Sequence, residues 1–211
     1  MVDQNERLGE FMLDKGIISR RQLEQALDER TDTGAPLGEI LLGMGAVSHA
    51  DLDEFDQVLQ RERLLEQLQL MFDMEMVFSD FYYLCAEHYP AAGDFWKSIG
   101  DDEVRHTLAI GKIIEGIYRD PNAYELGYGA SLSEIERVIG LVREASLRVK
   151  RDRPPLEKVL IMAHNFESAM MESRIFEVLS VGTREAQELI ESIYQETTQH
   201  MQKIMQAYSA T

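Results

Sequence analysis

The chain has 211 residues, of which 45% are hydrophobic, and carries a formal net charge of −17 at pH 7. Its length is sufficient for one well-developed hydrophobic core and a small second module. The negative charge excludes nucleic acid and anionic membrane as expected partners, because both need a cationic protein surface. We attribute the charge to solubility; a second interpretation is that it helps to draw in cations.

The single cysteine, Cys85, lies on an apolar helical row, and we interpret it as a small core residue. One cysteine excludes an intramolecular disulfide and a four-cysteine iron site. The first residues are charged and lack the apolar region of a signal peptide, and no apolar run is long enough to span a membrane. We therefore expect a cytoplasmic protein without membrane insertion.

Residues 8–19 recur in related form as residues 37–48. Each copy predicts a short helix that a glycine ends, at Gly16 and Gly45, followed by a new helix with a serine N-cap, at Ser19 and Ser48. These strong local signals predict a small all-helical module over residues 1–60.

No glycine or proline occurs between Gly45 and Pro90. One helix is therefore expected to run from Ser48 into the larger part of the chain, over residues 61–211. A hinge near residues 60–62 is the alternative, and the sequence leaves both open. The Pro90 turn then leads into a second long helix, which residues 120–122 end.

The second half predicts a separate amphipathic helix over residues 133–150, a third long helix after Pro155, a turn at Gly182 and a fourth long helix over residues 184–208. No convincing alternating strand is found. The sequence therefore predicts an all-α fold: a four-helix bundle with an extra helix in a long crossover, preceded by the small module.

Ionisable residues occupy the inward-facing rows of these four long helices, where hydrophobic side chains are expected. The residues are Glu75, Glu103, His106, Glu167 and His200. Charged groups are rarely placed in a bundle core without a partner. Carboxylates with one imidazole per metal suit iron or manganese, so we interpret the cluster as a metal site.

The numbering indicates that these residues share one level of the bundle. Glu75 and Glu103 both lie roughly 20 Å of helix from the Pro90 turn, so an antiparallel hairpin brings them together. Glu167 and His200 lie at comparable distances from the expected turn at Gly182.

Residues 103–106 form a complete Glu-x-x-His motif, and with residues 72–75, 165–169 and 196–200 they resemble the ferritin-like superfamily, in its rubrerythrin-like branch. The resemblance covers about residues 61–208. It implies a ferritin-like four-helix bundle that holds two irons through the five residues above. Such families act with oxygen or peroxide as reductases, oxidases or iron-storage proteins.

The last motif departs from the family, because Thr197 stands where a second Glu-x-x-His would place a carboxylate. Glu196, four residues before His200, shares a helical face with it and is an alternative ligand. Without Glu196, the site holds one metal or binds weakly. His164 is either a further ligand or a hydrogen-bonded core histidine; we favour the core histidine.

The N-terminal module resembles the N-terminal domain of type II secretion and type IV pilus assembly ATPases, over about residues 6–60. The resemblance rests on residues 7–23 and 36–41. Some relatives of that domain bind cyclic di-GMP and others dock proteins. Arg30 and Pro36 depart from the nucleotide-binding motif, so we favour a docking or structural role. The chain has no phosphate-binding loop of an ATPase.

Two functions follow as hypotheses. The first is a non-haem iron oxidoreductase or responder that acts with oxygen or peroxide and needs an external electron donor. The second is a non-catalytic regulatory or adaptor protein whose N-terminal module binds a protein partner or ligand while the bundle serves as scaffold or metal sensor. Iron storage is a third and weaker hypothesis. A second apolar face on the first long helix is consistent with a homodimer.

Overall fold

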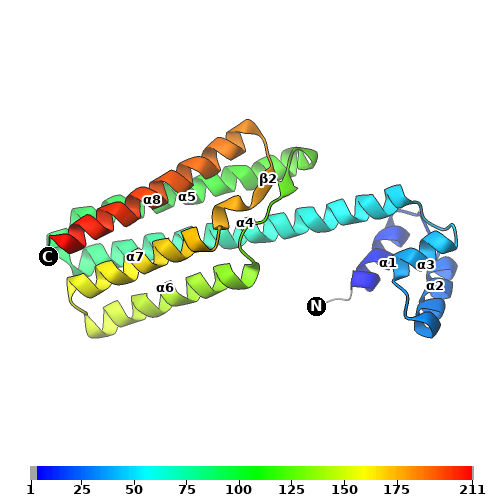
Figure 1. Cartoon of the computed structure of the whole chain (residues 1–211), viewed down its shortest axis with the longest axis horizontal. Helices are drawn as coiled ribbons and strands as arrows, with labels where there is room; N and C mark the ends of the chain where they lie inside the picture. Colours follow the sequence, from blue (N-terminus) through cyan, green and yellow to red (C-terminus); the bar gives the residue numbers. More distant parts are fainter. Residues whose placement is uncertain (1–3, 211) are drawn as a thin grey trace. The chain divides into compact units, whose positions relative to one another are not determined.

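Helices form nearly all the regular structure of residues 4–210, the part of the chain that the computed structural model describes (Figure 1). The predicted all-α, bundle-type fold is confirmed. The chain divides between Gln60 and Arg61 into two compact units, and each unit has its own hydrophobic core.

The N-terminal unit is built from short helices joined at the predicted glycines. Gly16 and Gly45 have positive φ angles of 67° and 64°, which a residue without a Cβ adopts at no steric cost. Ser19 caps the second helix in a capping box with Gln22. Its helices are α1 (Gln4–Asp14), α2 (Arg20–Thr33), α3 (Leu37–Gly43) and the first part of α4 (His49–His88).

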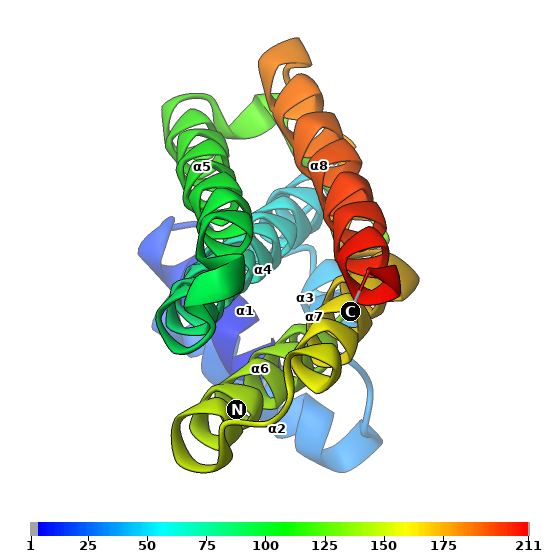
Figure 2. The same ribbon diagram turned by 90° about the vertical axis from the view of Figure 1, so that its left-hand side faces the viewer.

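Helix α4 continues without interruption through residues 60–62, so the sequence segment that we considered as a hinge is helical. The bundle unit contains the rest of α4 together with three further long helices. These are α5 (Gly93–Arg119), α7 (Leu156–Glu172) and α8 (Arg184–Ser209). The extra helix of the crossover is α6 (Leu132–Asp152), which packs against α7 (Figure 2).

Short 3-10 turns lie in the connections, at Pro90–Ala92, Pro121–Ala123 and Ile175–Glu177. Two connections also pair as an antiparallel ribbon of β1 (Glu125–Leu126) and β2 (Leu179–Val181). The expectation that the chain has no strand is therefore wrong to this extent. Strands of two and three residues are too short to show an alternating pattern.

The predicted turn at Gly182 is also wrong, because α7 already ends at Glu172 and Gly182 lies just before α8. Arg174 follows in the left-handed conformation, with φ 55°. Glu167 thus lies only about 8 Å of helix from the end of α7, whereas His200 lies about 24 Å into α8. Residues 173–183 span this difference in length between the two helices, so Glu167 and His200 still lie at the same level of the bundle.

Candidate metal centre

The four long helices bring the five core residues of the sequence prediction together. Each replaces a hydrophobic residue in a buried helical row, as Glu75 does between Met71 and Phe78. All five are at most 2% exposed. They come from α4 (Glu75), α5 (Glu103 and His106), α7 (Glu167) and α8 (His200).

The five residues form two groups of three whose ligand atoms lie within 4.8 Å of one another. We call Glu75, Glu103 and His106 the Glu75 group, and Glu103, Glu167 and His200 the Glu167 group. Both groups contain Glu103. Its side chain therefore stands where a carboxylate can bridge two ions.

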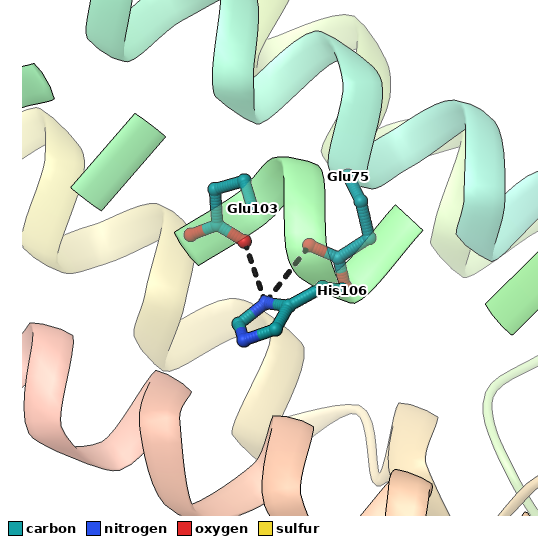
Figure 3. Close-up of side chains that lie close together, drawn as sticks. All are labelled: Glu75, Glu103 and His106. Carbon is teal, nitrogen blue, oxygen red and sulfur yellow. Dashed lines mark hydrogen bonds and ion pairs between the residues drawn. The ribbon is translucent and has the colours of Figure 1, made fainter. Parts of the chain in front are cut away.

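Each oxygen of Glu103 faces a different histidine. The Oε2 atom lies 2.8 Å from Nδ1 of His106, which is also 3.6 Å from Oε2 of Glu75 (Figure 3). The Oε1 atom lies 3.1 Å from Nδ1 of His200, which is 3.7 Å from Oε1 of Glu167. Both histidines thus present the same ring nitrogen to the carboxylates.

Further residues hold the Glu167 group in place. Nε2 of His200 lies 3.0 Å from Oδ2 of Asp102, and the hydroxyl of Tyr82 donates a hydrogen bond to Oε1 of Glu167. The Tyr82 ring stacks on Trp96 with 5.7 Å between ring centroids. A proton on Nε2 that bonds to Asp102 leaves Nδ1 of His200 as an acceptor, which is the form that binds a metal.

The pKa values of the three glutamates depend on their burial and on the charges close to them. Burial and the charge of Glu103 raise the pKa of Glu75 to about 8. The same two causes raise the pKa of Glu167. Burial alone would raise the pKa of Glu103, but the hydrogen bond to His106 and the nearby imidazole of His200 outweigh it and hold that pKa well below its usual value.

The pKa values of the two histidines are raised as well, but by the neighbouring carboxylates and against the effect of burial. Burial disfavours the charged imidazolium, yet the carboxylates around each ring outweigh burial. Glu103 and Glu75 raise the pKa of His106 to about 11, and Glu103 and Glu167 raise that of His200 to about 10. Without metal, the centre therefore holds protons in the positions that cations would take.

Several buried polar atoms of the centre have no hydrogen-bond partner among the described residues. They include both carboxylate oxygens of Glu75, Oε2 of Glu167 and Oγ1 of Thr197. A buried acceptor without a partner costs roughly 1–3 kcal/mol. Metal coordination would satisfy the carboxylate oxygens, so the residues present fit a metal ion.

The remaining predicted site residues lie outside the two groups. Glu196 is partly exposed; its Oε2 atom lies 2.8 Å from Arg105 and 3.4 Å from Nε2 of His106. Thr197 is buried in the row of His200. His164 is half-buried, with Nδ1 3.5 Å from the hydroxyl of Ser168.

The sequence analysis missed Asp102 as the partner of His200. Asp102 is adjacent to Glu103 in the chain and is therefore turned about 100° away from the inward row of α5. It reaches α8 from the side, with its side chain 13% exposed. A search for carboxylates one position away from the inward row would have included it.

No family model, curated protein or solved structure matches the chain. Among the described residues, no helix combines the length and apolar character that crossing a membrane requires.

Proposed function

We propose that the centre binds two divalent transition-metal ions, one in each group, with Glu103 shared between them. The proposed metal is iron, with manganese as the alternative, because the groups offer carboxylate oxygens and one imidazole per ion. We further propose that the protein is a non-haem iron oxidoreductase or responder that acts with oxygen or peroxide.

One observation carries the proposal: two buried groups of three potential metal-ligating side chains share Glu103 and contain carboxylate oxygens that make no hydrogen bond in the described part of the chain. A metal-free polar core is the competing explanation. Cores of that kind usually satisfy each buried oxygen with a hydrogen bond, whereas Glu75 makes none among the described residues and Nδ1 of His106 lies 3.6 Å from its Oε2 atom.

Bound iron would supply one-electron chemistry with oxygen or peroxide. The residues around the bound iron would orient its ligands and limit its contact with water. Tyr82 and Asp102 orient Glu167 and His200, and the buried ring of Phe78 lies one turn from Glu75. Such an apolar surround limits the access of water, and electrons would come from an external donor.

Metal analysis tests the proposal. Protein loaded anaerobically with iron(II), or with manganese(II), and then desalted is expected to retain about two ions per chain. The exposed residue Glu87 on α4 offers a matched control, and Glu87→Ala is expected to retain as much metal as the unaltered protein. Peroxide-dependent oxidation of the bound iron, followed by absorbance, tests the redox part. Metal content near zero would refute the proposal.

A second function is partner binding by the N-terminal unit. It is favoured by one observation, that residues up to Gln60 form a compact unit with a hydrophobic core of their own. A partner captured by the full chain should be lost when residues 1–60 are removed. If every partner stays bound to residues 61–211, this role is wrong.

A further inference from the structure

Thr197 is the polar residue of the centre that the proposed metal ligation does not use. It is 1% exposed and lies on the buried row of α8, three residues before His200 and four after Ile193. Two neighbours on α8 locate it. Glu196 lies 3.4 Å from His106, and His200 lies 3.1 Å from Glu103. Thr197 therefore lies in the core at the level of the two groups, about 60° around α8 from His200 and on the side away from Glu196.

The hydroxyl of Thr197 differs from those of other helical threonines in the described part of the chain. Thr107 and Thr198 donate to the carbonyl four residues earlier, at 2.9 Å and 3.0 Å. Thr197 makes no such bond, and its buried Oγ1 atom has no hydrogen-bond partner within residues 4–210. A buried hydroxyl in this state is available to a ligand.

Charge gives a second and independent reason to expect a ligand here. Two divalent ions bring four positive charges, and Glu75, Glu103 and Glu167 bring three negative ones, so one positive charge remains. The imidazoles bind metals as neutral groups. An uncompensated charge in a buried site is costly, and an anion removes that cost.

The surrounding charges do not supply the missing anion. Asp102 pairs with Arg105 at 2.6 Å and with Lys203 at 3.7 Å. Glu196 pairs with Arg105 at 2.8 Å. These two carboxylates and two cations cancel one another, so the excess positive charge stays at the centre.

We infer that the metal-loaded centre binds a small monoanion, of the size of azide or formate, to which Thr197 donates a hydrogen bond. The inference rests on the proposed metal site and adds a ligand site to it. A glutamate at position 197 would fill this place with its own carboxylate; threonine leaves it open to an anion from solution.

Azide titration of protein loaded with cobalt(II), a divalent ion whose visible absorbance changes with its ligands, tests the inference at the charge counted above. The unaltered protein is expected to bind azide with saturation. Thr197→Glu should lose azide binding while it retains its metal, because its carboxylate supplies the missing charge. Thr197→Val keeps the shape and removes only the hydroxyl, and it should bind azide about tenfold more weakly.

Thr198→Val is the matched control, since the Thr198 hydroxyl is occupied by the carbonyl of Tyr194. Its azide affinity should equal that of the unaltered protein. Metal content measured in the same samples separates the two claims. Protein without metal refutes both the metal site and the anion site. Metal-loaded protein that binds no azide, or in which Thr197→Glu and Thr197→Val bind it as the unaltered chain does, refutes the anion site alone.

Discussion

The Glu75 group and the Glu167 group use the same residue types, but they differ in what surrounds them. In the Glu167 group, Asp102 bonds to the far nitrogen of His200 and Tyr82 donates to Glu167. In the Glu75 group, neither oxygen of Glu75 has a hydrogen-bond partner among the described residues. Ligands that hydrogen bonds already orient lose less freedom on binding a metal. We therefore expect the Glu167 group to bind the first ion and the Glu75 group to bind the second, more weakly.

The largest expected effect comes from the residue that the groups share. Glu103→Ala should reduce the metal content from about two ions per chain to almost none, because it removes a ligand from both groups. Glu75→Ala should leave one ion, in the Glu167 group. Elemental analysis of the desalted proteins measures both. Retention of one full ion by Glu103→Ala would show that the two groups are independent.

The next effect is the dependence of metal affinity on pH in the Glu75 group. At pH 7 the metal-free Glu75 group holds a proton on His106, whose pKa is raised to about 11, and one on Glu75, whose pKa is raised to about 8. A metal must displace these protons, so affinity rises with pH, by about tenfold per pH unit for each proton displaced. The dependence should become less steep above pH 8, where Glu75 is already ionised.

Competition with a metal-binding dye between pH 6 and pH 9 measures this dependence. Affinities that do not change over that range would contradict the proton-filled state of the metal-free centre.

Removing the support of His200 should have a smaller effect. Asp102→Ala is expected to weaken binding in the Glu167 group by about 10–100-fold, because the orientation of the His200 ring is lost. Glu188→Ala is the control, since it also removes a carboxylate from an ion pair, with Arg184 at 2.7 Å, but on the exposed surface of α8. Titration calorimetry distinguishes the two variants. Equal effects of the two changes would mean that the orientation of the His200 ring does not matter.

The smallest expected effect is that of Tyr82→Phe, which removes only the hydroxyl that bonds to Glu167. The metal-free protein should lose about 1–3 kcal/mol of unfolding free energy, because a buried carboxylate oxygen then lacks its donor. Tyr83→Phe is the control, since the Tyr83 hydroxyl bonds to the exposed Asp101 at 2.6 Å. Urea denaturation of both variants measures the difference; equal losses would contradict a special role for Tyr82.

The sequence predicted the features that local patterns determine. Glycine stops at Gly16 and Gly45 and the capping box at Ser19 follow from a few neighbouring residues, and the structure confirms them. The five core residues could also be found, because an ionisable side chain in a heptad row is conspicuous. The prediction that Glu167 and His200 lie close together assumed a turn at Gly182, and that assumption is wrong. The two residues still lie close together because α7 ends earlier than predicted and residues 173–183 span the remaining distance to α8.

The sequence could not predict contacts that depend on how helices approach one another. Asp102 is outside the inward row and meets His200 only because α5 and α8 pack side by side. The ribbon of β1 and β2 depends on two connections that are distant in the chain. At Gly127 a Cβ would lie 2.1 Å from the carbonyl oxygen of Glu177, so this close approach requires glycine. Such contacts are properties of the assembled bundle.

Anomalous diffraction from crystals of the iron-loaded protein, collected at the iron absorption edge, tests the central claim most directly. We predict two peaks on either side of the Glu103 carboxylate, one near Nδ1 of His106 and one near Nδ1 of His200. At half the saturating amount of iron, the peak near His200 should be the stronger. Loaded crystals with no peak beside Glu103, or with iron only elsewhere in the chain, would contradict the claim.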